Sequence, residues 1–316
     1  MAGIQHRLIR TALGTAVGAL RTGETNIRQL RRMMDLGSLM FFMPWGVDRE
    51  SVQIGGRLSA EWLIPQKADH NKVMLYLHGG GYAVGSKQTH RSLAGQIAKQ
   101  AGYCGLLVEY RLAPEDPHPA ALEDALLAYE WLLETGHAPE DIVIAGDSAG
   151  GGLATATMLS IREKGLPQPS CGVLISPWVD LTISQESVYK YVDRSPMIFL
   201  REMKAWARNY AGIYPEDHPL VSPLYADLHD LPPLLIQLSD TEVLVDEGTQ
   251  LAEKARAAGV DVTFQKYKGL IHVWQIYWRY LPQARDAITK IVGFIDQHSP
   301  SDVRVPQPIA DAATPA

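Results

Sequence analysis

A serine flanked by glycines carries the clearest chemical signal in the sequence. Ser148 stands in the motif Gly-Asp-Ser-Ala-Gly at 146–150, directly after the apolar run 142–145 and before a stretch of small residues typical of a helix. A strand, a sharp turn and a helix in this order form a nucleophile elbow, which lifts the serine hydroxyl above a sheet at the helix N-terminus. Ser148 is therefore the candidate nucleophile of an acyl-transfer reaction.

A base is expected at His272, because a serine hydroxyl is a weak nucleophile at neutral pH and needs a neighbouring proton acceptor. His272 comes shortly after the apolar run 262–267. In doubly wound folds the ligand crevice lies at the carboxyl ends of the strands, so a histidine just after a late strand is well placed. His272 is therefore the candidate general base for Ser148.

A carboxylate is needed to fix the tautomer of the histidine and to stabilise the imidazolium ion. Asp240 and Glu242 follow the apolar run 234–238, and the resulting order of serine, acid and histidine is typical of α/β-hydrolases. Asp246 and Glu247 begin a predicted helix, where their charges complement the helix dipole. These considerations leave both Asp240 and Glu242 open as the acid.

A run of glycines supplies the groups that would stabilise a developing negative charge. The motif His-Gly-Gly-Gly at 78–81 follows directly after the apolar run 73–77. Acyl transfer creates an alkoxide that needs preset N–H donors, and glycines let the backbone approach it without an intervening Cβ. Each such donor is worth about 2.7–4 kcal/mol of transition-state stabilisation. The loop 78–81 is therefore predicted to form an oxyanion hole.

Composition and motifs argue against several other functions. The formal net charge is −6 and no long basic run occurs, which disfavours nucleic-acid binding. The sequence has no His/Cys cluster with zinc spacing. The glycines at 79–81 form neither a dinucleotide-binding fingerprint nor a P-loop. We therefore expect no metal and no cofactor.

Apolar runs that alternate with amphipathic stretches indicate the fold class. Short, continuous apolar strands separated by helices predict a largely parallel sheet covered on both faces. The expected strands are 51–54, 58–64, 73–77, 105–108, 142–145, 172–175, 234–238 and 262–267, and the expected helices are about 87–100, 119–135, 149–164, 246–258 and 282–297. The prediction is an α/β-hydrolase fold, with a mostly parallel central sheet flanked by helices and a helical cap.

Two segments are expected to form the cap. Residues 1–45 carry apolar side chains at helical spacing, and residues 181–225 interrupt the alternation with many aromatic residues, Met and Pro. The hydrolase core is then expected at 46–180 and 226–297. The tail at 298–316, rich in Pro and Ala, is expected to be disordered.

Several features favour a cytoplasmic location. The two cysteines, Cys104 and Cys171, each open an apolar run and are expected to be buried, reduced thiols. A basic and apolar stretch lies near the N-terminus, but no small-residue cleavage site closes it, so a signal peptide is not expected. No uninterrupted run of about 18 apolar residues occurs, so we expect no stable membrane insertion.

Four motifs together resemble those of the bacterial hormone-sensitive-lipase-like esterases. They are His-Gly-Gly-Gly-Tyr at 78–82, Tyr-Arg-Leu-Ala-Pro-Glu at 110–115, Gly-Asp-Ser-Ala-Gly-Gly at 146–151 and Ile-His at 271–272. The resemblance covers roughly residues 45–295 and implies an α/β-hydrolase with a helical cap. It also implies that the N–H groups of Gly80, Gly81 and Ala149 form the oxyanion hole.

The resemblance also selects between the two candidate acids. The family pattern looks like acid-Pro-Leu-x-Asp-Glu-Gly, and the matching stretch here runs from Glu242 to Gly248. Glu242 then takes a position where the family commonly has Asp, and Val243 replaces the usual proline. The triad that the resemblance implies is Ser148, Glu242 and His272.

The expected reaction is hydrolysis of short- to medium-chain carboxylic esters through an acyl-enzyme, with a small-molecule ester as the binding partner. Candidates for an apolar substrate pocket, or equally for packing within the cap, are Tyr82, Phe42, Met43, Trp45, Met197, Phe199 and Leu200. Two alternatives stay open: a lactone, carbamate or amide hydrolase with the same triad, and a non-catalytic binding module on the same fold. The predicted last strand, near 262–267, offers an exposed edge through which a homodimer could form.

Overall fold

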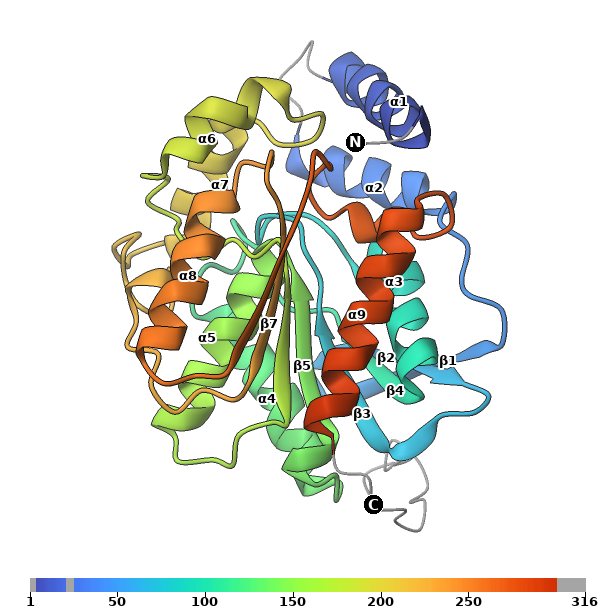
Figure 1. Cartoon of the computed structure of the whole chain (residues 1–316). Coiled ribbons are helices and arrows are strands. Elements are labelled where there is room, and N and C mark those ends of the chain that lie inside the picture. Colours follow the sequence, from blue (N-terminus) through green and yellow to red (C-terminus); the bar gives the residue numbers. More distant parts are fainter. Residues whose placement is uncertain (1–3, 21–25, 300–316) are drawn as a thin grey trace.

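A central sheet of eight strands runs through the part of the protein that the computed structural model describes, residues 4–20 and 26–299 (Figure 1). The strand order is β1-β2-β4-β3-β5-β6-β7-β8. The pairs β1–β2 and β2–β4 are antiparallel, and every later pair is parallel. The strands are β1 (Val47–Ile54), β2 (Leu58–Pro65), β3 (Asp69–Leu77), β4 (Tyr103–Val108), β5 (Ile142–Asp147), β6 (Cys171–Ile175), β7 (Leu234–Ser239) and β8 (Val262–Tyr267). The predicted, mostly parallel α/β sheet is thus confirmed.

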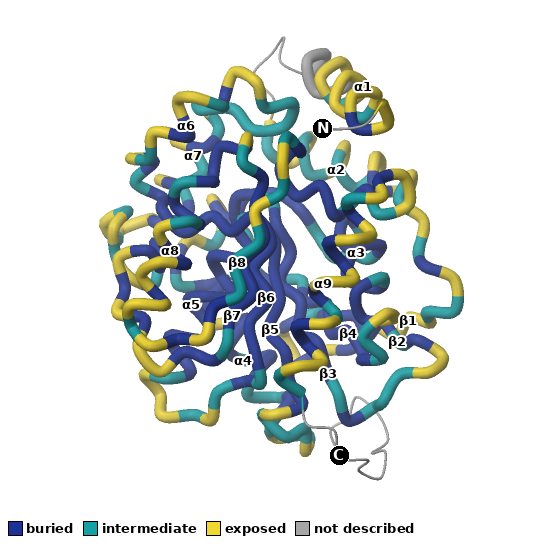
Figure 2. The backbone as a smooth tube through the Cα atoms, viewed as in Figure 1, coloured by how far each residue is buried: buried dark blue, intermediate teal, exposed yellow. Residues whose placement is uncertain are grey.

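Helices cover both faces of this sheet, as expected for strands that are apolar along their whole length (Figure 2). Helices α3 and α9 lie on one face, and α4, α5 and α8 lie on the other. Side chains alternate along β3, so Leu75 packs with the residues of α4 and α5 while Met74 and Tyr76 pack with those of α3 and α9. The bounds are α3 (Lys87–Ala101), α4 (Ala120–Glu134), α5 (Ala149–Glu163), α8 (Val245–Ala257) and α9 (Pro282–His298).

Further helices lie beyond the carboxyl ends of the parallel strands (Figure 1). They are α1 (Ile4–Leu20), α2 (Ile27–Ser38), α6 (Glu186–Tyr191) and α7 (Leu200–Ala211). Short 3-10 segments also occur along the chain, at Pro139–Asp141, Val192–Arg194, Pro223–Tyr225 and Trp274–Tyr277. Helices α1 and α2 come from the predicted cap segment 1–45, and α6 and α7 come from the interval 181–225. They cover the end of the sheet at which the candidate chemical groups were expected.

Some predicted boundaries change in the structure. Strand β1 begins at Val47 rather than at residue 51, and β3 begins at Asp69 rather than at residue 73. Apart from Val47 the added residues are polar, so a search for apolar runs misses them. The β1 addition nevertheless pairs with β2, and Asp69 of the β3 addition pairs with Tyr103. The predicted tail also starts too early, because α9 ends at His298.

Other predicted segments lie outside the described residues. They are 1–3 and 21–25 of the expected cap and 300–316 of the expected tail. Within the described residues, no helix is long and apolar enough to cross a membrane.

Candidate active site

Ser148 stands at the junction between β5 and α5, with the backbone in an unusual conformation. Its φ is 53° and its ψ is −123°, and it is the N-cap residue of α5. A Cβ on Gly150 would lie 2.0 Å from the carbonyl oxygen of Leu77, and one on Gly146 would lie 2.2 Å from the carbonyl oxygen of Gly150. Only glycine fits at either position, so the sequence allows the sharp turn that holds the serine at the end of the sheet.

His272 and Glu242 are joined by a hydrogen bond at the same end of the sheet. The Nδ1 atom of His272 lies 2.7 Å from Oε2 of Glu242, and both side chains are buried. The other carboxylate oxygen, Oε1, accepts from the backbone N–H of Ser239 at 2.7 Å and from the hydroxyl of Ser176 at 3.1 Å. Because an ionised carboxylate only accepts, Nδ1 carries the hydrogen and Nε2 is left as a proton acceptor.

Asp240, the other carboxylate considered for the acid, has a different partner. Its Oδ1 accepts from the backbone N–H of Gly269 at 2.7 Å, and its own N–H donates to the carbonyl of Tyr267. Asp240 thus links the end of β7 to the turn that follows β8. Of the two carboxylates, the structure brings Glu242 to His272.

The glycine loop after β3 is held in conformations that favour glycine. Gly80 has a φ of 126° and Gly81 a φ of 61°. A Cβ on Gly80 would lie 2.0 Å from the carbonyl oxygen of Val84, and one on Gly81 would lie 2.2 Å from a ring atom of Trp206 in α7. Ala149, the first residue of α5, is fully buried beside the serine turn. The loop therefore packs tightly against a helix from the predicted cap.

Asp147, the residue before Ser148, connects the glycine loop to the serine turn. This role was not predicted from the sequence. Oδ1 of Asp147 accepts from the hydroxyl of Tyr76 at 2.8 Å and from the N–H of Gly79 at 3.2 Å. Its Oδ2 lies 3.2 Å from Nε2 of His90 in α3. The buried carboxylate of Asp147 thus holds the start of the glycine loop against the turn at Ser148.

The electrostatics of this group follow from its burial and its pairing. Burial by itself would raise the pKa of Asp147, but the charge and hydrogen bond of His90 and the Tyr76 hydroxyl outweigh it and hold that pKa below its ordinary value. Burial would likewise lower the pKa of His90, but Asp147 raises it overall. Burial and the charge of His90 lower the pKa of the neighbouring His78 to about 3, against the hydrogen bond to the Gly79 carbonyl and the charge of Asp147, which raise it. These shifts favour the ionised forms of His90 and Asp147 and the neutral form of His78.

Three of the predicted pocket residues precede β1 and lie beside α3. The side chains of Phe42 and Trp45 are exposed, at 64% and 89%, and Met43 packs against Gly95 of α3. The backbone carbonyls of Phe42 and Trp45 accept hydrogen bonds from Ser92 and Lys99 of that helix. Their contacts therefore attach this segment to the outer helix layer.

The other predicted pocket residues are at least half-buried near α7. Met197, Phe199 and Leu200 lie at the start of this helix, and Leu200 packs against the main core cluster. Tyr82, which follows the glycine loop, is 1% exposed, and its ring stacks on that of Tyr210 at a centroid distance of 3.6 Å. Tyr82 is thus a packing contact between the glycine loop and α7.

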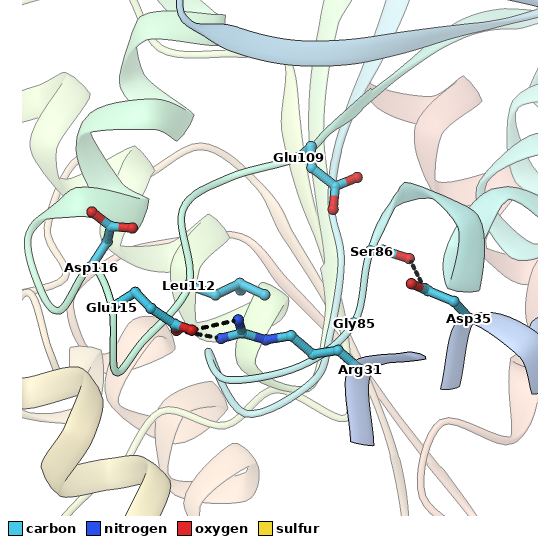
Figure 3. A pocket seen from close by; sticks show the side chains of 8 residues that line it. All are labelled: Arg31, Asp35, Gly85, Ser86, Glu109, Leu112, Glu115 and Asp116. Carbon is cyan, nitrogen blue, oxygen red and sulfur yellow. Dashed lines mark hydrogen bonds and ion pairs between the residues drawn. The ribbon is translucent and has the colours of Figure 1, made fainter. Parts of the chain in front are cut away.

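A polar cavity of about 380 Å³ lies between α2, the segment before α3 and the loop that follows β4 (Figure 3). It is lined by Arg31, Asp35, Gly85, Ser86, Glu109, Leu112, Glu115 and Asp116. Arg31 and Glu115 form an ion pair at 2.8 Å, and Asp35 accepts from Ser86 at 2.6 Å. Neither Ser148 nor His272 lines this cavity. Within the described residues, no group of three or more His, Cys, Asp and Glu side chains could hold a metal ion.

Comparison with known proteins agrees with this arrangement. Residues 74–276 match the family described as alpha/beta hydrolase fold. The chain is 41% identical over 279 residues to an acetyl-hydrolase of Streptomyces hygroscopicus, a match that covers 87% of this chain and 91% of that protein. A solved esterase from the bacterial hormone-sensitive lipase family superposes with a TM-score of 0.90 at 36% identity, covering 94% of this chain and 99% of the other. The esterase EstE5, soaked with p-nitrophenyl butyrate, matches with the same identity and coverage and a TM-score of 0.88.

These comparisons argue against the hypothesis of a non-catalytic binding module. The relatives are named as hydrolases or esterases, and the matches cover most of both chains. The matched range 74–276 includes Ser148, Glu242 and His272. The chain belongs to the α/β-hydrolase fold family, within its hormone-sensitive-lipase-like esterases, and is a carboxylic ester hydrolase.

Proposed function

We propose that the protein hydrolyses short- to medium-chain carboxylic esters through an acyl-enzyme formed on Ser148. The observation that carries the proposal is the 2.7 Å hydrogen bond between His272 Nδ1 and Glu242 Oε2 at the end of the sheet where the Ser148 turn lies. It leaves Nε2 of His272 as the atom that accepts the serine proton. No metal or cofactor is needed for this chemistry.

The reaction proceeds in two halves. Ser148 Oγ attacks the ester carbonyl as its proton passes to His272, and the resulting oxyanion is stabilised by the N–H groups of Gly80, Gly81 and Ala149. His272 then gives the proton to the departing alkoxide, so the alcohol leaves and the acyl group stays on the serine. Water deacylates the enzyme by the same steps, with His272 again as the base.

A short acyl chain is supported by the contacts around the glycine loop. The ring of Trp206 lies directly against Gly81, which leaves little room there for a long acyl chain. The relatives named above include an acetyl-hydrolase and an esterase studied with a butyrate ester. We assign the cap to residues 1–45 and 181–225, whose described helices α1, α2, α6 and α7 cover the candidate site.

The decisive experiment compares wild type with Ser148→Ala on p-nitrophenyl acetate and butyrate. The substitution is expected to lower kcat by at least about 10³-fold, and a fluorophosphonate probe should label wild type but not the variant. Ser51→Ala, at an exposed position of β1, is the matched control and should behave as wild type. Full activity of Ser148→Ala would contradict the mechanism. A parallel panel of lactone, carbamate and amide substrates measures the preference for linear esters.

A cytoplasmic location and a homodimer formed along β8 belong to the proposal as well. Strand β8 is at the end of the strand order, as predicted for an edge that could pair with a second subunit. Sedimentation equilibrium distinguishes the monomer mass of 34.8 kDa from twice that value.

A further inference from the structure

We infer that Glu247 is a positioning residue that holds the loop 176–180 between the nucleophile turn and the acid, and that it does so as an uncharged carboxyl group. This inference rests on the proposed roles of Ser148 and Glu242. From the sequence alone, the charge of Glu247 is expected to interact with the dipole of the helix in whose first turn it lies. In the structure its side chain is fully buried in the first turn of α8 and faces the loop that follows β6.

Only one of the two carboxyl oxygens of Glu247 makes hydrogen bonds to the described residues. Oε1 accepts from the backbone N–H of Val179 at 2.6 Å and from that of Asp180 at 3.1 Å. Oε2 is buried and has no hydrogen-bond partner among the described residues. An ionised carboxylate buried in this way leaves charge without a partner, whereas a protonated one keeps its hydrogen on Oε2 and still accepts through Oε1.

The loop that Glu247 holds contacts two members of the proposed triad. The N–H of Trp178 donates to the carbonyl of Ser148 at 2.9 Å, and the hydroxyl of Ser176 donates to Oε1 of Glu242 at 3.1 Å. The carbonyl oxygen of Trp178 also lies 2.1 Å from where a Cβ on Gly152 would be, so the loop packs tightly on the first turn of α5. A displacement of this loop therefore moves the serine turn and the acid together.

The surroundings of Glu247 disfavour a charge on it. The titratable groups of the described residues that interact electrostatically with it include Asp180 in the loop, Glu242 after β7 and Tyr82 after the glycine loop, and none of these three is a cation. Burial raises the pKa of Glu247 well above its ordinary value, and the charges of Asp180 and Glu242 raise it further, against the two backbone hydrogen bonds that lower it. Ionisation of Glu247, once pH exceeds this raised pKa, would place a second negative charge near Glu242 and disturb the loop.

The test compares Glu247→Ala, Glu247→Gln and Glu253→Gln on p-nitrophenyl butyrate across pH. Loss of the side chain is expected to lower kcat by about 10–100-fold at neutral pH, because small misplacements of reacting groups have effects of this size. KM should change little. Gln should restore most of the rate, since its oxygen accepts the same two N–H groups without a charge. Glu253, exposed on the same helix, is the matched control and should give wild-type values.

The pH profile is the readout that a merely structural role would not move. Wild type should lose activity as rising pH ionises Glu247, and Glu247→Gln should keep its activity to higher pH. Two results would overturn the inference: Gln impaired as severely as Ala, or identical alkaline limbs for Gln and wild type. If Glu247→Ala does not fold, the comparison of Gln with wild type still decides. Activity retained by Ser148→Ala would instead refute the proposed function, which separates the two failures.

The pH dependence of the free energy of unfolding tests the same inference independently of activity. Because the pKa of Glu247 is raised in the folded state, the folded protein keeps a proton that the unfolded chain releases above pH about 4.5. Its contribution to the free energy of unfolding is therefore complete at lower pH and is lost as pH rises through the raised value. The difference in Tm between Glu247→Gln and wild type should increase with pH over this range, while Glu253→Gln should show no such trend.

Discussion

His90 and Asp147 form a buried pair, with Nε2 of His90 3.2 Å from Oδ2 of Asp147, directly beneath the glycine loop. The pair joins α3 to the end of β5, directly before Ser148. Through its other oxygen, Asp147 also accepts the N–H of Gly79. The His90–Asp147 pair therefore affects both the stability of the fold and the position of the proposed oxyanion donors.

Substitution of His90 by Ala should lower the free energy of unfolding by about 3–5 kcal/mol, because it leaves a buried carboxylate without its partner. Urea denaturation at pH 6 measures this loss. His90→Gln, which keeps a donor near Asp147, should lose less. His229→Gln at an exposed position is the control, and a loss at His90 no larger than at His229 would refute the pairing argument.

The same pair predicts how stability depends on pH. The pKa of Asp147 is lowered in the folded state, so its contribution is present above pH about 3.8 and is lost as pH falls through the lowered value. The pKa of His90 is raised, so its contribution is complete below pH about 6.5 and is lost as pH rises through the raised value. Wild type should lose this stabilisation at both limits, whereas His90→Ala should show a flatter dependence of Tm on pH.

The acid can be identified by comparing Glu242→Gln with Asp240→Asn. Glu242→Gln should lower kcat by about 10²–10⁴-fold, since His272 then loses the carboxylate that fixes its tautomer. Asp240→Asn should change kcat by less than about threefold. Its uncharged amide oxygen accepts the Gly269 N–H more weakly than the carboxylate does, so Tm should fall slightly. Measurement of kcat on p-nitrophenyl butyrate for both variants tests this prediction. The reverse order of effects would assign the acid to Asp240.

The contact between Gly81 and Trp206 predicts a compensated substitution. Gly81→Ala forces a Cβ onto the indole ring and places Ala at a left-handed φ, so the free energy of unfolding should fall by about 1–3 kcal/mol. Trp206→Ala in the same chain should recover the steric part. A double-mutant cycle should therefore give a coupling energy of about 0.5–3 kcal/mol; strict additivity would show that the two residues do not meet.

The two cysteines should be unreactive in the folded protein. Cys104 and Cys171 are buried, and burial raises the pKa of each thiol to about 12. Because the thiolate is the reactive form, a disulfide reagent should modify neither residue under conditions that fully modify free glutathione. After denaturation in guanidinium chloride, both thiols should react. Rapid modification of the folded chain would indicate that strand β4 or β6 opens locally.

Local sequence patterns predicted the parts of the site that lie next to each other along the chain. The apolar run before Ser148 and the glycines around it specify a strand, a turn and a helix, because steric limits on the backbone are local. The position of His272 followed from the order of the strands. Asp240 and Glu242 could not be separated this way, since both follow the same strand and only their partners across the fold differ.

Contacts between distant segments were beyond the reach of the sequence. Glu247 looks like any acidic residue in the first turn of a helix, and its burial against the loop 176–180 depends on how α8 packs. Phe42 and Trp45 are apolar, but apolar side chains are common on protein surfaces, so their type does not say which way they face. The partner of Asp147 could not be predicted for the same reason, because His90 lies on α3, 57 residues away along the chain.

The place of β8 at the margin of the sheet has a consequence for inactivation by heat. His272 follows a strand that is hydrogen-bonded to β7 alone, whereas the strand before Ser148 is held on both sides. Fraying at a margin requires less free energy than opening the interior. His272, the proposed base, can therefore move away from Ser148 while the remainder of the sheet is still intact, so activity should be lost at a lower temperature than the one at which the sheet unfolds.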